Sequence, residues 1–132
     1  LPILTAFLKA EMVNHAFYAV VGDFNIAPES IDVHAPEQWA GHVLCSDPER
    51  NAFSQMLALG LQDCYRLKNP SSQEFSWWDY RMNAFKRNIG LRIDHILASQ
   101  ALLNGCNHCI IDRAPRQLER PSDHAPVLAT FF

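Results

Sequence analysis

A strand pattern is followed directly by polar residues in the segment Phe17-Tyr18-Ala19-Val20-Val21-Gly22-Asp23-Phe24-Asn25-Ile26-Ala27-Pro28. Residues 17–21 are aromatic and β-branched and end at a glycine, which predicts a short buried strand. The proline and small residues that follow predict a loop. Asp23 and Asn25 stand two residues apart at the strand end, so we expect their side chains to project to the same side. This segment therefore predicts a strand that presents a carboxylate and an amide to a metal ion or a phosphate.

The segments on either side predict helices and further strands. Residues 1–14 have apolar side chains at helical spacing, which is typical of an amphipathic helix. A second helix is expected from Ser46-Asp47-Pro48-Glu49 to Leu59, with Asp47 as its cap and Gly60 after its end. Residues 29–46 lack periodicity and read as irregular. Strands are expected at 61–65, 75–80, 93–98, near Ile110, and at 127–132, with a loop at 121–126 before the last.

Length and composition are those of one domain spanning residues 1–132. The chain is 48% hydrophobic, which is enough for a packed core. Because the expected order is helix, strand, helix and then mostly strand, we predict an α/β (α+β) fold in which helices cover sheets. We expect no membrane span, because no run of eighteen apolar residues occurs. Residues 1–10 lack the signature of a signal peptide, and the absence of an initiator methionine is consistent with a fragment or a processed product.

Charge is unevenly distributed along the chain. Residues 1–65 carry eight acids and two bases (2 − 8 = −6), whereas residues 66–132 carry nine bases and six acids (9 − 6 = +3). A local basic patch is what a phosphate-binding surface needs, so DNA binding is permitted. Solvated loop charges would give the same pattern.

The four cysteines do not form the framework of a secreted protein. Cys106-Asn-His-Cys109 could join His42 and Cys45 in a zinc site, but the sequence has a single C-x-x-C. Reduced thiols are the default, and we expect a cytoplasmic protein.

Three polar clusters contain the candidate catalytic groups: Gly22-Asp23-Phe24-Asn25, Arg92-Ile93-Asp94-His95 and Ser122-Asp123-His124. Each has a structural alternative, because the first could cap a turn, Asp94 could pair with Arg92, and His124 could be a satisfied histidine. Together they favour function. Carboxylates with an imidazole and an amide suit metal-assisted phosphodiester hydrolysis.

The order and spacing of four motifs resemble the C-terminal half of the exonuclease III type of abasic-site endonuclease. The motifs are Gly22-Asp23-Phe24-Asn25-Ile26-Ala27-Pro28, Phe75-Ser76-Trp77-Trp78-Asp79-Tyr80-Arg81, Gly90-Leu91-Arg92-Ile93-Asp94 and Pro121-Ser122-Asp123-His124-Ala125-Pro126-Val127. The first and last also occur in the wider endonuclease/exonuclease/phosphatase superfamily of DNase I-like proteins. The middle two resemble the DNA-repair branch. The resemblance implies half of a four-layer α/β sandwich.

The resemblance also implies roles for individual residues and a Mg²⁺ (or Mn²⁺) cofactor. Asp23 would activate or orient the attacking water, and Asn25 would hold a phosphate oxygen. His124 would contact the scissile phosphate, with its ring oriented by Asp94. Asp123 would be the metal-site carboxylate, with Asp23 and Asn25 beside it.

By the same resemblance, the substrate would be double-stranded DNA with abasic sites, incised 5′ to the lesion, with 3′–5′ exonuclease activity. Trp77, Leu91 and Ile93 would line the pocket for the flipped-out abasic sugar, and Arg81 and Arg92 would contact the substrate. Because strand alternation places Trp77 and Trp78 on opposite faces, we expect Trp77 in the pocket and Trp78 in the core.

The family's N-terminal half, which supplies further metal and phosphate ligands, has no counterpart in these residues. Either a separate N-terminal half or a second copy in a homodimer would then complete the fold. The alternative functions are a catalytically incomplete fragment that only binds DNA or a partner, and a phosphoesterase of the same superfamily with another substrate.

Overall fold

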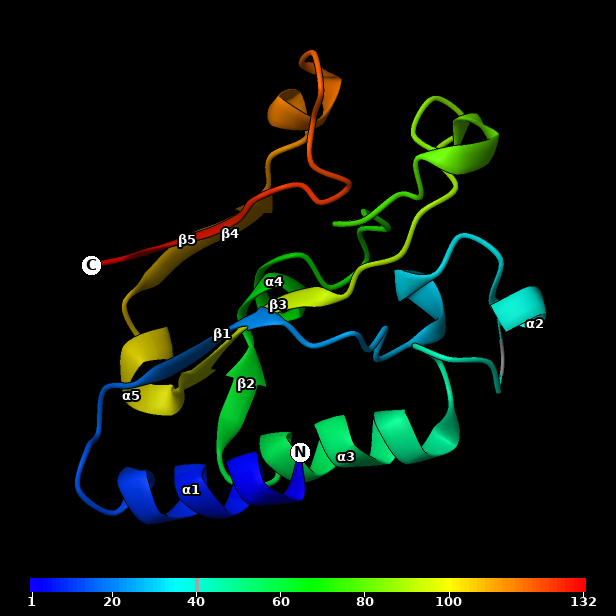
Figure 1. The fold of residues 1–132 in the computed structure, drawn as a ribbon. Coiled ribbons are helices and arrows are strands. Elements are labelled where there is room, and N and C mark those ends of the chain that lie inside the picture. The colour runs from blue at the N-terminus through cyan, green and yellow to red at the C-terminus, as the bar shows by residue number, and fades with distance from the viewer. Residues whose placement is uncertain (40) are drawn as a thin grey trace.

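A three-stranded antiparallel sheet lies at the centre of the chain, which was analysed as a computed structural model that describes residues 1–39 and 41–132. The strand order is β1 (Ala19–Asp23), β3 (Asp94–Ser99), β2 (Leu61–Asp63). Two helices, α1 (Pro2–Met12) and α3 (Asp47–Leu57), cover one face of it in Figure 1. Their apolar side chains form one core with the sheet, in which Met56 and Leu97 are fully buried.

A second sheet of two antiparallel strands lies on the other side of the central sheet (Figure 1). It consists of β4 (Cys106–Ile111) and β5 (Val127–Phe131). Between the sheets are α4 (Cys64–Lys68) and a second core cluster that contains Trp78. The remaining helical segments are short: α2 (Pro36–Trp39), α5 (Gln100–Leu103) and three turns of 3₁₀ helix at Ser30–Asp32, Arg81–Asn83 and Ala114–Gln117. The α/β class predicted from the sequence is confirmed.

The N-cap of helix α3 is Ser46, one residue earlier than the expected cap Asp47. The Oγ of Ser46 accepts from the backbone N–H of Glu49, and the Glu49 carboxylate accepts from the backbone of Ser46. This reciprocal pair is a capping box, so the prediction that Asp47 caps the helix was wrong. Asp47 is instead the first helical residue.

Two expected strands differ from the prediction. Residues 61–65 form a strand only to Asp63, because the Asp63 side chain accepts from Arg66 and starts α4. Residues 75–80 are not a strand: Trp77 makes single bridges to Leu91 and His124 and no continuous ladder. The backbone of this segment makes hydrogen bonds to two different loops in turn. It is therefore extended, as its composition predicted, but it forms no continuous strand.

Strand β1 is exposed, although its composition predicted a buried strand. Phe17 is 63% exposed and Val21 is 66% exposed. β1 pairs with β3 along one edge and forms an outer edge of the three-stranded sheet. On the second sheet, Ile110 and Leu128 are each 46% exposed. Apolar side chains in these positions on sheet faces are typical of surfaces that pack against further structure.

The alternative zinc site is excluded by the packing. Cys106 and Cys109 lie in the cluster of the second sheet, whereas Cys45 packs with Val33 and Leu91. All four thiols are free and buried. Within residues 1–39 and 41–132, no helix has the length and apolarity that crossing a membrane requires.

Candidate active site

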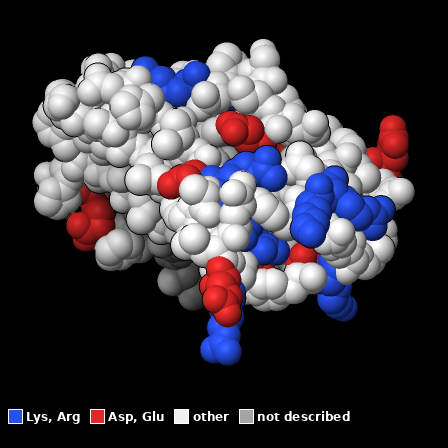
Figure 2. All heavy atoms as spheres, turned by 90° about the horizontal axis from the view of Figure 1, so that it is seen from above, with Lys and Arg blue, Asp and Glu red and all other residues white. Residues whose placement is uncertain are grey.

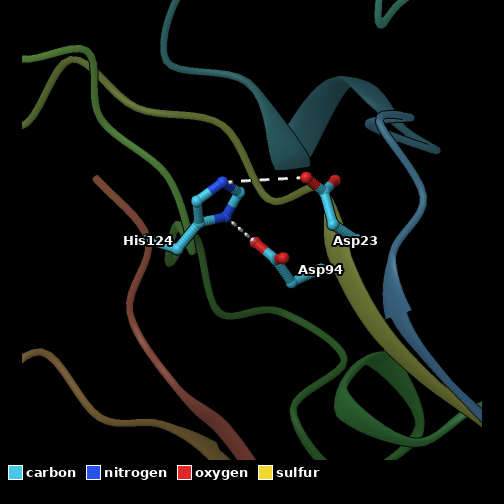
Figure 3. Close-up of side chains that lie close together, drawn as sticks. All are labelled: Asp23, Asp94 and His124. Atoms are coloured by element: carbon cyan, nitrogen blue, oxygen red, sulfur yellow. Dashed lines mark hydrogen bonds and ion pairs between the residues drawn. The ribbon is translucent and has the colours of Figure 1, made fainter. Parts of the chain in front are cut away.

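The pairing of β1 with β3 places Asp23 directly opposite Asp94. In Figure 3, the imidazole of His124, from the loop before β5, turns one ring nitrogen toward each of the two carboxylates. Its Nδ1 is 2.8 Å from Oδ2 of Asp94, and its Nε2 is 3.7 Å from Oδ2 of Asp23. These three residues, separated by up to 101 positions in sequence (124 − 23), therefore form one cluster.

The loop after β1 has a conformation that suits its sequence. The backbone N–H of Asn25 donates to Oδ1 of Asp23 at 2.9 Å, which leaves Oδ2 to face His124. Asn25 has a φ of 54°, in the left-handed region that asparagine tolerates better than most residues. Asn25 is exposed at the rim of the cluster. The backbone of Asn25 therefore lies against the Asp23 carboxylate, and the projection of the two side chains to the same side stays a prediction.

The buried serine of the aromatic motif fixes the start of β3. Ser76 Oγ accepts from the backbone N–H groups of Ile93 and Asp94 at 3.0 and 3.1 Å, and Ser76 is fully buried. Sequence reasoning missed this residue, because a serine within an aromatic run carries no signal of its long-range partner.

The electrostatics of the cluster favour a proton between Asp94 and His124. Burial raises the pKa of Asp94, against hydrogen bonds from His124 and Ser76. Burial alone would lower the pKa of His124, but the hydrogen bond and charge of Asp94, with the charges of Asp23 and Asp123, raise it. The imidazole is therefore held with Nδ1–H toward Asp94 and Nε2 toward Asp23.

Asp123 lies near the same ring nitrogen of His124 as Asp23 and is joined to the aromatic motif. Its Oδ1 is 3.8 Å from His124 Nε2, and its Oδ2 accepts from Nε1 of Trp77 at 3.0 Å. Trp77 is half-buried and Trp78 is fully buried, as expected. Trp77 therefore forms a wall between the cluster and the surface beyond it.

Beyond Trp77 is an open groove of about 700 Å³. Leu91 and Arg81 line it, and so do His34, Trp39 and His42, which sequence reasoning missed. That this groove takes the substrate stays a prediction. Those three residues come from the stretch that was read as irregular, where no periodicity marks a side chain as pocket-lining. Ile93 is 2% exposed and packs in the cluster beneath Leu91.

Arg92 does not reach the groove, so its prediction as a substrate contact was wrong. It is 1% exposed, and its guanidinium binds Asp32 and Asp63 rather than Asp94. Alternation along an extended chain turns Arg92 into the core. Its two partners are distant in sequence and could not be read from local spacing.

The cluster has the donor set of an oxygen-preferring divalent cation. One ligand atom each from Asp23, Asp94 and His124 lies within 4.8 Å of the others. Carboxylate oxygens with a single imidazole are ligands that suit Mg²⁺ or Mn²⁺, whereas structural zinc sites are typically rich in thiolates. Asp123 and Asn25, also predicted as ligands, border this group rather than belong to it.

The chain is similar in sequence to known nucleases over most of its length. Residues 6–124 match the model of the Endonuclease/Exonuclease/phosphatase family. Exodeoxyribonuclease III of Haemophilus influenzae is 43% identical over 119 residues, which is 85% of this chain and 45% of that protein. An exodeoxyribonuclease of Bacillus subtilis is 37% identical over 107 residues, covering 80% and 41%.

Solved structures show the same fold over nearly the whole chain. A 3′ phosphatase from Neisseria bound to a product DNA hairpin superposes with a TM-score of 0.96 at 45% identity, over 98% of this chain and 50% of that one. An AP endonuclease from Archaeoglobus fulgidus gives 0.91 at 37% identity, over 97% and 50%. The chain spans about half the length of the relatives it matches. From its sequence and its fold, the chain belongs to the endonuclease/exonuclease/phosphatase family.

Proposed function

We propose that the chain carries one half of the active site of a DNA-repair phosphodiesterase similar to exodeoxyribonuclease III. The observation that carries this proposal is the placement of His124 between two carboxylates, bonded to Asp94 at 2.8 Å and facing Asp23 at 3.7 Å. A histidine oriented by one carboxylate and set beside another suits phosphodiester hydrolysis. The free thiols agree with action in the cytoplasm.

In this reaction the Asp23 carboxylate accepts a proton from the attacking water. The backbone N–H of Asn25 donates to this carboxylate and keeps it in place. His124 donates from Nε2 to an oxygen of the scissile phosphate, because its Nδ1 is already engaged by Asp94. Asp94 thereby sets the ring orientation. The Asn25 side chain, exposed at the rim, binds a second phosphate oxygen.

Mg²⁺ or Mn²⁺ is the cofactor that the donor set fits. Asp23 would hold it together with the neighbouring Asp123 and the amide oxygen of Asn25, whereas Asp94 and His124, the other members of the cluster, are engaged with each other. When bound, the ion supplies positive charge to the phosphate and lowers the pKa of a coordinated water.

The groove beyond Trp77 is proposed to take the abasic deoxyribose of a double-stranded substrate, incised on its 5′ side, and to support 3′–5′ exonuclease activity. Trp77 and Leu91 offer apolar walls, and Arg81 stands at the rim with its guanidinium on Asp79. An abasic nucleotide is the easiest to extrude, since it has lost its base pair.

Basic residues are exposed at and beyond one border of the groove, where Arg81 and Arg87 line it. In Figure 2, Lys and Arg side chains gather on one face, with acidic ones between them. Exposed bases are contributed by the loops at 81–87 and 113–120: Arg81, Lys86, Arg87, Arg113 and Arg120. Such a face can bind the phosphates of a duplex that enters the groove.

The half-length match implies that a second component completes the site. The exposed β1 edge and the apolar faces at Val21, Ile110 and Leu128 are the surfaces where it would dock. A separate N-terminal half or a second copy of this chain would both fit this role.

The test is incision of a duplex that carries a single abasic-site analogue, with magnesium or with chelator, by the chain and by Asp23→Ala. Once a second copy or an added N-terminal half completes the site, we expect magnesium-dependent cleavage 5′ to the lesion that is lost in Asp23→Ala and kept in Glu11→Gln, an exposed control on α1. Cleavage that persists in Asp23→Ala would contradict the proposed site. DNA binding without cleavage would support a fragment that binds but requires its other half.

A further inference from the structure

Behind the active-site strands lies a buried network of charges that the reaction does not use. Arg92 Nε donates to Oδ1 of Asp32 at 2.7 Å, and its two terminal nitrogens donate to Asp63 at 2.7 and 3.1 Å. Arg66 binds the same oxygen of Asp32. Asp32 is completely buried and Arg92 is 1% exposed. Buried charges at this density are retained only when their hydrogen bonds are met, so their geometry is fixed.

His95 joins this network to the active-site loop. Its Nδ1 lies 3.2 Å from a terminal nitrogen of Arg92, and its Nε2 lies 2.8 Å from the carbonyl oxygen of Ile26. Arginine has only donors, so Nδ1 of His95 must be the acceptor. The ring proton is then on Nε2 and is donated to Ile26. The network thus dictates one neutral tautomer.

The surroundings of the ring agree with this assignment. His95 is 1% exposed, and the rings of Phe24 and Phe53 pack on it edge to face at 5.5 and 5.0 Å. Burial, and then the charge of Arg92, lower the pKa of His95 to about 4. The imidazole is therefore neutral at neutral pH.

Both ends of this connection lie next to residues of the active site. Ile26 follows Asn25 in the loop, and His95 follows Asp94 in β3. The loop is otherwise tied down by Phe24 N–H on Ile93 at 3.0 Å and Ala27 N–H on Leu44 at 2.8 Å. Because alternate residues of a strand face opposite sides, β3 presents Asp94 to the site and His95 to the core.

We propose that His95 is a positioning residue, which holds the loop of Asp23 and Asn25 at a fixed distance from Asp94 through its Nε2–H bond to Ile26. This inference rests on the proposed function for its catalytic meaning. Its structural content, a tautomer and a tethered loop, stands apart from any reaction.

The experiment compares His95→Phe with His95→Gln in the full chain. Phenylalanine keeps a ring between Phe24 and Phe53 but removes both hydrogen bonds. Glutamine restores an acceptor for Arg92 and a donor for Ile26. The readout is the backbone amide exchange of Asn25 and Ala27, with Cys109 and Ile110 of β4 as an internal reference for the intact fold.

We expect exchange at Asn25 and Ala27 to rise about tenfold in His95→Phe, as for the loss of one buried hydrogen bond, and to return toward the wild-type rate in His95→Gln. The β4 amides should not change in either variant. Equal protection in His95→Phe and the wild type, or a failure of glutamine to restore it, would overturn the proposal.

A second measurement needs no variant. Nitrogen-15 shifts of the His95 ring in the wild-type chain should show Nε2 protonated and Nδ1 bare, and the opposite tautomer would overturn the proposal. Where the wild-type protein cleaves DNA, His95→Phe should lower kcat with little change in KM, and glutamine should recover it. Absence of cleavage by the wild type would count against the proposed function, whereas the exchange and tautomer results would still decide the role of His95.

Discussion

The hydrogen bond between Asp94 and His124 determines what the imidazole can donate. This bond engages Nδ1 of His124, and the surrounding carboxylates raise the pKa of His124. Nε2 is then free to donate toward the Asp23 side. In the proposed mechanism, donation from Nε2 of His124 therefore depends on Asp94, a carboxylate that orients the ring and is not itself proposed to contact the substrate.

Replacing Asp94 by asparagine should lower the rate of cleavage by about 100-fold or more, because the amide keeps the shape but not the charge that holds the protonated ring. The measurement is kcat on a duplex with one abasic-site analogue, with Glu11→Gln on α1 as an exposed control. A variant with the wild-type rate would remove Asp94 from the mechanism.

His95 should make the stability of the fold depend on pH. Its folded pKa of about 4 lies below its ordinary value of 6.5, so the unfolded chain binds more protons between these values. The free energy of unfolding should rise with pH across this interval, by about 3 kcal/mol at most. The contribution is complete above about pH 6.5 and is lost as the pH falls toward 4.

The charged groups around His95 are Arg92, which opposes its protonation, and Asp63 and Asp32, which favour it. Denaturant melts at several pH values should show a flatter dependence between pH 4 and 6.5 for His95→Gln than for the wild type. Identical slopes would mean that the ring is protonated in the folded state.

Among the helices and strands, the sequence correctly predicted those elements whose conformation is determined by interactions between residues close in sequence. Helix α3 was found from its first turn and its final glycine, and β3 and β5 from their apolar runs. The segment 75–80 was not, because its conformation is set by bridges to Leu91 and His124. The pairing of Arg92 with Asp32 spans 60 residues and leaves no trace in spacing.

The cap of α3 should contribute measurably to stability. Ser46→Ala removes the acceptor for the N–H of Glu49 and should reduce the free energy of unfolding by about 1 kcal/mol. Ser54→Ala, at an exposed position of the same helix, should change it by less than about 0.5 kcal/mol. Urea unfolding of the two variants gives the comparison. Equal effects would show that the capping box is not a stabilising feature.

For the whole molecule, the distribution of charge matters more than its sum of −3. Exposed bases lie in the loops at 81–87 and 113–120, whereas α1 lies across the sheet from them (Figure 1). A duplex bound at the groove would contact the basic residues of these two loops and would not contact α1.

Lys86→Gln should therefore weaken DNA binding and reduce the slope of log affinity against log salt by about 1. Lys9→Gln removes the same charge from α1 and should leave the slope unchanged. Fluorescence anisotropy with a short duplex at several salt concentrations measures both. An equal change in the two variants would mean that binding is not confined to the proposed face.

The exposed apolar faces and the half-length match lead to the central claim, that this chain supplies Asp23, Asp94 and His124 to a site completed by another half. The direct measurement mixes the chain with the part of Haemophilus influenzae exodeoxyribonuclease III that it does not match, and follows magnesium-dependent cleavage of an abasic duplex. We expect the mixture to cleave far faster than either component, and His124→Ala in this chain to abolish the gain. A folded one-to-one complex without cleavage, or cleavage indifferent to His124→Ala, would contradict this claim.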